Sequence, residues 1–154
     1  MSEDSLSDGE YAYFRLLMYL PEKLTKCIDL VSQDYLRDTN LKTYFMAYIF
    51  HIKSNDGISQ KDLKLLIPHD KSRISVVVNE LIELGLVYDD GVGRSSSLHL
   101  TDSGMNAFVI CKMLFDLVGR EIFKMSRENY ELIKQKNIEF DKHLDSILSR
   151  YSKS

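Results

Sequence analysis

The sequence predicts a mainly α-helical protein with one small β-hairpin, and three observations lead to that fold class. The chain of 154 residues holds only two prolines and seven glycines, and chains poor in these helix breakers are rich in helix. Four of the glycines crowd between residues 85 and 104, so strands and irregular structure are expected between residues 53 and 104. On both sides of that region, apolar residues recur every three or four positions, which is the period of one helix face.

Composition places the chain among ordinary globular proteins. Apolar residues make up 44% and charged residues 28%, which excludes a disordered or fibrous class. Two cysteines are too few for a disulfide framework and fit a reducing compartment. No apolar run reaches the ~18 residues of a membrane span, and the first ten residues are acidic, so we expect a cytoplasmic protein without a membrane partner. The net charge of −3 does not by itself indicate a nucleic-acid partner.

Two helices are predicted in the first part of the chain. The first carries the apolar stripe Tyr13, Leu17, Leu20, Leu24, Cys27 and Val31. Because proline is tolerated in the first turn of a helix, either a new helix begins at Pro21 or one long helix is kinked there. Residues 38–40 offer caps for a largely buried helix that carries Leu41, Tyr44, Phe45, Tyr48, Ile49 and Ile52.

The next segment has the pattern of a helix-turn-helix. Ser59 and Asp62 resemble a capping box, and the helix that they begin must end before Pro68. Asp70 can cap a second helix over residues 71–84, which Gly85 ends. The inward stripe of that helix is Ile74, Val77, Val78, Leu81 and Ile82, and its outward face carries Lys71, Ser72, Arg73, Ser75, Val76 and Asn79. Small polar and basic residues on the exposed half of a second helix are typical of DNA-binding helix-turn-helix units.

A β-hairpin follows and defines the subtype. Residues 86–88 read as a strand, residues 89–93 have turn composition, and residues 96–100 alternate polar and apolar side chains. A helix-turn-helix followed by a hairpin is a winged helix. Thr101 then caps a long helix over residues 102–123, and Ser126 caps the last helix, to about residue 150.

The last helix carries a heptad seam. Its members are Tyr130, Ile133, Asn137, Phe140, Leu144, Ile147 and Tyr151, at alternating spacings of three and four. Such a seam can lie on the chain's own core. A period of 3.5 over three heptads, in a chain whose core is already formed, instead favours a partner helix.

The order of these elements is similar to that of the MarR family of bacterial transcription regulators. Residues 58–63 (Ile-Ser-Gln-Lys-Asp-Leu) resemble the family's strand and the start of its first helix. Residues 70–75 (Asp-Lys-Ser-Arg-Ile-Ser), followed by Val78, Leu81 and Gly85-Leu86-Val87, resemble its recognition helix and helix exit. Arg94 stands six residues before Leu100, as the family's wing arginine does, and residues 100–104 (Leu-Thr-Asp-Ser-Gly) match the motif that opens its fifth helix.

The resemblance implies one domain over residues 1–154 that forms a homodimer. Residues 1–38 and 102–154 would be dimerisation helices, and residues 41–100 would form the winged-helix lobe. Two such lobes would bind a pseudo-palindromic operator in double-stranded DNA. Many members of the family respond to small anionic phenolic ligands or to oxidation, so a small aromatic effector is also implied.

The sequence departs from the family pattern in its charges. Val92 replaces an aspartate, Val76 stands where arginine is frequent, the wing is shorter, and the strand before the wing reads Tyr88-Asp89-Asp90 instead of being basic. Residues 57–100 hold five basic and six acidic side chains, a net charge of −1. Since phosphate neutralisation supplies much of DNA affinity, these departures motivate an alternative, a winged-helix protein-interaction module or antagonist with weak or no DNA binding.

Candidate DNA contacts follow from the helix-turn-helix and the wing. They are Ser59, Lys61, Lys64, Lys71, Ser72, Arg73, Ser75, Asn79 and Arg94. The lysines would lie near phosphates, the residues of the second helix would face major-groove base edges, and Arg94 would enter the minor groove. The candidate dimer interface comprises Leu17, Leu24, Tyr130, Ile133, Asn137, Phe140, Leu144 and Ile147.

Other chemistry is weakly supported. Cys27 and Cys111 read as small core residues, although oxidation sensing stays open. The four histidines have no metal-ligand spacing, no cofactor motif is present, and no nucleophile or carboxylate pair indicates an enzyme. Six tyrosines are candidates for an effector crevice: Tyr13, Tyr19, Tyr35, Tyr44, Tyr48 and Tyr130. The sequence therefore predicts a DNA-binding transcriptional regulator, a homodimeric repressor of the MarR type, and leaves the operator and the effector unidentified.

Overall fold

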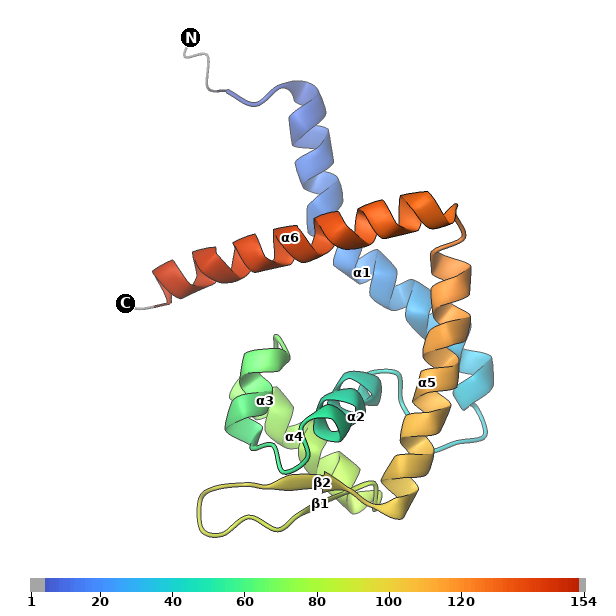
Figure 1. The fold of residues 1–154 in the computed structure, drawn as a ribbon, viewed down its shortest axis with the longest axis vertical. Helices are drawn as coiled ribbons and strands as arrows, with labels where there is room; N and C mark the ends of the chain where they lie inside the picture. The colour runs from blue at the N-terminus through green and yellow to red at the C-terminus, as the bar shows by residue number, and fades with distance from the viewer. Residues whose placement is uncertain (1–4, 153–154) are drawn as a thin grey trace. The chain divides into compact units, whose positions relative to one another are not determined.

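The computed structural model describes residues 5–152 and is mainly helical, as predicted. Its elements are α1 (Asp8–Leu36), α2 (Phe45–Ser54), α3 (Gln60–Leu66), α4 (Lys71–Glu83), β1 (Val87–Asp89), β2 (Leu98–Leu100), α5 (Asp102–Ile122) and α6 (Arg127–Tyr151). The chain divides into two compact units, one through Val118 and one from Gly119. In the first unit, α2, α3, α4 and the hairpin pack together (Figure 1).

The first helix is continuous through Pro21, so no new helix begins at that residue. The carbonyl of Pro21 accepts a hydrogen bond from the Thr25 hydroxyl at 2.9 Å. At its N-terminus, Ser7 and Glu10 form a reciprocal capping box that the sequence prediction did not identify. Within the described chain, α1 buries only Ser32 and Leu36, so most of its apolar stripe is exposed.

The second helix begins at Phe45, four residues later than the prediction at Leu41. The reason lies in Thr39, whose hydroxyl donates to the Leu36 carbonyl at 2.9 Å and accepts from the Leu41 amide at 3.1 Å. Thr39 therefore closes the end of α1 and does not cap α2. Leu41 remains buried as predicted, but it lies in the connection.

The core lies in the winged-helix lobe, and the predicted apolar stripes supply it. Fully buried side chains include Phe45, Tyr48, Ile49 and Ile52 from α2, Leu63 from α3, Ile74, Val77, Val78 and Leu81 from α4, and Leu98 from β2. Ile82, predicted to face inward, is only half-buried. Ser59, Asp70 and Ser126 cap their helices as predicted, each accepting a hydrogen bond from the amide three residues later.

The hairpin is antiparallel and pairs Val87 with Leu100, Tyr88 with His99 and Asp89 with Leu98. Leu98 also bridges to Ile58, so the segment before α3 lies along β2 as a third, one-residue strand. The second strand is shorter than the predicted residues 96–100 because Ser96 and Ser97 make other bonds. The Ser96 hydroxyl accepts from the Gln60 amide at 2.7 Å, and the Ser97 amide donates to the Asp89 carboxylate at 2.8 Å.

The start of α5 is fitted closely to the end of α4. Thr101 caps α5 by accepting from the Gly104 amide at 3.0 Å, and its own amide donates to the Leu86 carbonyl at 3.1 Å. A Cβ atom on Gly104 would lie 2.0 Å from the Leu86 carbonyl oxygen. The Leu-Thr-x-x-Gly motif thus encodes a close backbone approach that only glycine permits. Among the described residues, no helix is long and apolar enough to cross a membrane.

We expect Gly104→Ala to lower the free energy of unfolding by about 1–3 kcal/mol, because the added methyl group must push α5 away from Leu86. Gly119→Ala is the matched control, since Gly119 also lies in α5 but a methyl group added there would meet no other atom within 4 Å. That control should be neutral or slightly stabilising. Urea denaturation followed by circular dichroism measures both changes, and equal stabilities for the two variants would contradict the close fit.

Candidate nucleic-acid interface

The exposed face of α4 is centred on three side chains spaced four and three residues apart. They are Ser72, Val76 and Asn79, all of them exposed, and Val76 is 59% exposed. Ser75 lies beside them and is half-buried. The face therefore combines a hydroxyl, an isopropyl group and an amide, side chains small enough to enter a groove of DNA. The sequence pattern places Val76 on the outward face but does not mark it as a contact.

Arg73 lies on the flank of this face and is held there by an aromatic ring. Its guanidinium carbon is 5.0 Å from the centre of the Tyr44 ring, a cation–π geometry. The Tyr44 hydroxyl donates to Glu80 at 2.7 Å, and Lys42 forms an ion pair with the same carboxylate. These donors, Lys42 first and then Tyr44, lower the pKa of Glu80. The network joins the connection before α2 to α4 and sets the direction of Arg73.

The remaining candidates on the helix-turn-helix are Ser59, which caps α3, Lys61 in its first turn, Lys64 in its last turn, and Lys71 at the start of α4. Lys61 and Lys64 on α3 and Lys71 at the start of α4 are exposed, as phosphate contacts require. The Ser59 hydroxyl accepts from the Asp62 amide at 3.0 Å, which leaves its proton available to an external acceptor. The exposure of the three lysines and the position of all four residues on the helix-turn-helix support their assignment, while Ser59 itself is half-buried.

The wing loop holds Arg94 in a tight, internally bonded turn. The Asp89 carboxylate accepts from the amides of Gly91 at 2.9 Å and Ser97 at 2.8 Å, which closes the loop from within. A Cβ atom on Gly91 would lie 2.0 Å from the Ser95 carbonyl oxygen, and Gly93 has a φ of +68°. Arg94 is exposed between these constraints. The loop is tied to α3 through the bond between Ser96 and the Gln60 amide.

Most of the acidic side chains of the lobe have partners inside it. The Asp70 carboxylate accepts from the Arg73 amide at 2.7 Å, Glu80 is held by Lys42 and Tyr44, and Asp89 closes the wing loop. Asp90 accepts from His99 at 2.9 Å. Of these four carboxylates, Glu80 is paired with a charged Lys42 and Asp90 with the titratable His99, whereas Asp70 and Asp89 accept from neutral backbone amides and keep their full negative charge.

Other candidate chemistry finds little support. Among the described residues, no group of three or more histidine, cysteine or acidic side chains is placed to hold a metal ion. His69 is half-buried, and its Nδ1 lies 2.9 Å from the Tyr48 hydroxyl. Cys27 is exposed, contrary to the expectation of a core residue, whereas Cys111 is buried, and burial raises its pKa to about 11.

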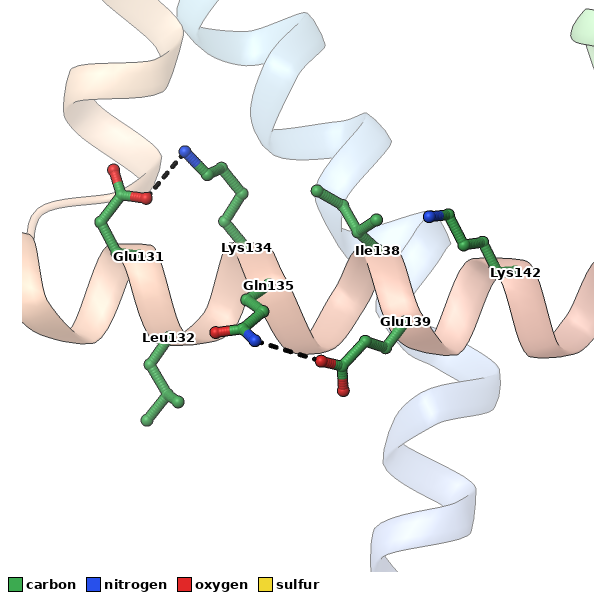
Figure 2. A pocket seen from close by; sticks show the side chains of 7 residues that line it. All are labelled: Glu131, Leu132, Lys134, Gln135, Ile138, Glu139 and Lys142. Atoms are coloured by element: carbon green, nitrogen blue, oxygen red, sulfur yellow. Dashed lines mark hydrogen bonds and ion pairs between the residues drawn. The ribbon is translucent and has the colours of Figure 1, made fainter.

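Two hollows of the described chain differ from the predicted tyrosine crevice. One, of about 370 Å³, is lined by Asp29, Leu30, Gln33, Leu36, Arg37, Leu41, Lys42 and Thr43. The other, of about 550 Å³, follows α6 and is lined by Glu131, Leu132, Lys134, Gln135, Ile138, Glu139 and Lys142 (Figure 2). Figure 2 shows polar side chains of that helix bonded to one another, Glu131 to Lys134 and Gln135 to Glu139. None of the six candidate tyrosines lines either hollow.

Elements and side chains together define the class: a winged helix-turn-helix with long helical flanks, whose second helix exposes small polar side chains beside a stacked arginine. No protein-family model and no curated protein sequence matches the chain. Solved structures do match the fold of this chain, and that fold is the one of MarR regulators. The matching structures include a MarR protein from Peptoclostridium difficile DA00132, with a TM-score of 0.78 and 15% identity over 97% of this chain and 96% of that one.

Two further structures bear on the fold. A MarR transcriptional regulator from Methanosarcina mazei Go1 has a TM-score of 0.71 and 21% identity, covering 92% of this chain and 95% of that one. A MarR family transcriptional regulator from Listeria monocytogenes, solved with a 26mer DNA, has a TM-score of 0.75 and 15% identity, covering 86% and 93%. The fold predicted from the motifs at residues 58–104 is thereby confirmed over nearly the whole chain.

The burial and the raised pKa of Cys111 predict a thiol that reacts slowly. In the Cys27→Ser variant, the one remaining thiol should resist an aromatic disulfide reagent in the native protein. With a pKa of about 11, only about one thiol in a thousand is ionised near pH 8, and burial blocks access as well. The released thiolate chromophore measures the reaction, and the same variant unfolded in guanidinium is the control that should react fully. A fast reaction of the native variant would place Cys111 among reactive cysteines instead.

Proposed function

We propose that the chain is a DNA-binding transcriptional regulator, a homodimeric repressor of the MarR type. The observation that carries the proposal is the exposed face of α4, where Ser72, Val76 and Asn79 form the centre and Tyr44 holds Arg73 at the edge. A winged-helix fold that has a hydrogen-bonding helix face and an exposed wing arginine is suited to reading duplex DNA.

Each part of the lobe has a distinct role in this proposal. Lys61, Lys64 and Lys71 contact phosphates and set the register of the lobe on the duplex. On α4, Ser72, Ser75 and Arg73 face base edges, the arginine being suited to guanine and Asn79 to adenine. The methyl groups of Val76 are suited to the C5-methyl group of thymine, a contact that an arginine at that position would not make. Arg94 enters the minor groove from the wing.

The homodimer is proposed from the faces that one chain leaves exposed. No residue of α6 is buried in the described chain, although Ile133, Phe140 and Leu144 repeat at heptad spacing and are 39%, 47% and 41% exposed. On α1, Leu24 is 42% exposed and Leu17 is half-buried. A helix with an apolar heptad stripe, interrupted here at Asn137, and with no buried residue is typical of an interface that a partner covers. A second copy of the chain offers the same two stripes.

A dimer couples the two winged-helix lobes. Since its helices would set the distance between two α4 faces, it would select two half-sites one helical turn apart in a pseudo-palindromic operator. A small aromatic effector would bind more tightly to dimers with a different spacing of the lobes. It would lower the affinity for DNA by the difference between its binding free energies to the two arrangements. The protein would work in the cytoplasm.

A salt-titrated mobility-shift experiment tests this function against a second candidate. The DNA is the duplex upstream of the gene, alongside a duplex selected from a random library. Binding that weakens steeply with salt supports the regulator, because each phosphate contact releases about one counterion. No shift at low salt supports a protein-interaction module instead. That second candidate is favoured by two exposed apolar side chains, Leu65 at 81% and Val92 at 88%, on α3 and the wing.

Two arginine substitutions should have different effects on DNA binding. Arg73→Ala should weaken binding to the selected site by about 1–3 kcal/mol and relax the preference at one base pair, because a base-edge contact is lost. Arg94→Ala should weaken selected and unrelated duplexes more evenly and reduce the salt slope by about one, because a groove-backbone contact is lost. Titrations of both variants on both duplexes at two salt concentrations measure these effects.

Arg37→Ala is the control for the loss of one surface charge. Arg37 lies just after α1 and pairs with Asp34 in that helix, so its loss should leave the affinity for either duplex nearly unchanged. If Arg73→Ala behaved like Arg37→Ala on both duplexes, the assignment of α4 as the reading helix would be wrong. The protein-interaction candidate would then be favoured.

The heptad stripe of α6 predicts the oligomeric state. The native chain should have a mass near twice 17.9 kDa by light scattering at micromolar concentration. Leu144→Glu should give a monomer of reduced stability, because it places a charge in the apolar seam. Ile138→Glu, at a position 49% exposed and outside the heptad seam, is the control and should remain dimeric. A stable native monomer would remove the dimer proposal.

A further inference from the structure

A histidine in the wing bridges two carboxylates from separate parts of the lobe. His99 lies in the middle of β2, and its Nδ1 is 2.8 Å from an oxygen of Asp56, in the turn after α2. Its Nε2 is 2.9 Å from an oxygen of Asp90, at the start of the wing loop, and 3.1 Å from the Ser97 hydroxyl. The imidazole also stacks on the Tyr88 ring at 5.0 Å. Its side chain is only 18% exposed.

The two carboxylates define the protonation state that fits this arrangement. A carboxylate accepts hydrogen bonds, so both ring nitrogens must carry a proton to satisfy Asp56 and Asp90 together. A neutral imidazole can donate to one of them only, and the other carboxylate then faces a nitrogen lone pair. The bonds to Asp56 and then to Asp90 raise the pKa of His99 above its usual value of 6.5, in opposition to desolvation. The bonds from Ser97 and then His99 lower the pKa of Asp90.

Protonation changes the wing in two ways. First, the imidazolium ties the wing loop at Asp90 to the turn at Asp56, and this loop carries Arg94. Second, it changes the net charge of residues 57–100 from −1 to zero, which favours approach to phosphates. The backbone bonds from Gly57 to Leu98 and from Leu98 to Ile58 do not titrate, so the strand stays in place when the histidine loses its proton. Loss of the proton therefore releases the wing loop and not the strand.

We propose that His99, shared in its protonated form between Asp56 and Asp90, is a positioning residue for the wing that makes DNA binding by this chain dependent on pH. This inference rests on the proposed function. The groups that face the imidazole are Asp56 from the turn after α2, Tyr88 from β1, and Asp90 and Ser97 from the wing.

The sign of the pH dependence follows from the direction of the histidine shift. A group whose pKa is raised by folding contributes stability that is complete below its unfolded pKa and is lost as pH rises through its folded pKa. The His99 bridge is therefore complete below about pH 6.5 and is lost at higher pH, as the histidine deprotonates. Phosphates near the wing favour the same protonated form, so DNA binding takes up protons in this range and weakens as pH rises.

Affinity for the selected duplex should be measured at constant ionic strength from about pH 6 to about pH 8.5. For the native chain we expect a decrease of about three- to tenfold across this range. His99→Gln should give a flat profile near the high-pH affinity of the native chain, because glutamine cannot gain a charge. His143→Gln, an exposed histidine on α6, is the matched control and should keep the native profile. Circular dichroism confirms that each variant folds.

A DNA-independent measurement separates the bridge from the proposed function. The His99 ring proton resonances, followed by NMR against pH, should titrate above the usual range, and Asp56→Asn should move that midpoint down. Asp56 is exposed, so this variant is expected to fold. A native midpoint at or below the usual value, or a His99→Gln profile as steep as the native one, would overturn the inference. If the midpoint is raised but the chain shifts no duplex at low pH and low salt, the proposed function is wrong, and so is the pH dependence of DNA binding. The bridge between His99 and the two carboxylates would still be confirmed by that result.

Discussion

The pairing of Leu98 with both Asp89 and Ile58 is the contact on which the winged-helix lobe depends. Leu98 is fully buried; its amide donates to the Ile58 carbonyl and its carbonyl accepts from the Gly57 amide, each at 2.9 Å, while Asp89 is its register partner in the hairpin. Because α3 begins two residues after Ile58, this pairing also fixes where the helix-turn-helix starts. The wing and the start of α3 are thus positioned from one buried strand residue.

The carboxylates of this lobe have internal hydrogen-bond partners that the net charge does not reveal. Six acidic side chains among residues 57–100 suggest a surface poorly suited to DNA, but Asp70, Glu80, Asp89 and Asp90 each meet a donor within the lobe. Such carboxylates close a loop, cap a helix or orient a basic side chain. The apolar substitutions relative to MarR patterns are different in kind, because Val76 and Val92 are exposed and nothing within the lobe explains them.

Local rules in the sequence predict much of this fold, but they miss the contacts that join distant residues. Helix starts at Ser59, Asp70 and Ser126 follow from cap chemistry within four residues, and the α4 core stripe follows from helical period. The predicted start of α2 is wrong because Thr39 has two possible partners, and only the folded chain selects between them. The Tyr44–Arg73 stack and the His99 bridge join residues 29 and 43 positions apart, and no periodicity connects them.

The distribution of buried residues shows which apolar surfaces a single chain leaves exposed. The lobe has a closed core, whereas α1 buries two residues and α6 buries none among those described, although both helices carry apolar stripes. Exposed apolar stripes of this length are typical of surfaces that another molecule covers. If the cover is a second chain, the free energy that completes the core also fixes the distance between two wings. The residues that hold the fold together and those that set the spacing of DNA half-sites are then the same, so selection for stability and selection for operator spacing act on one surface.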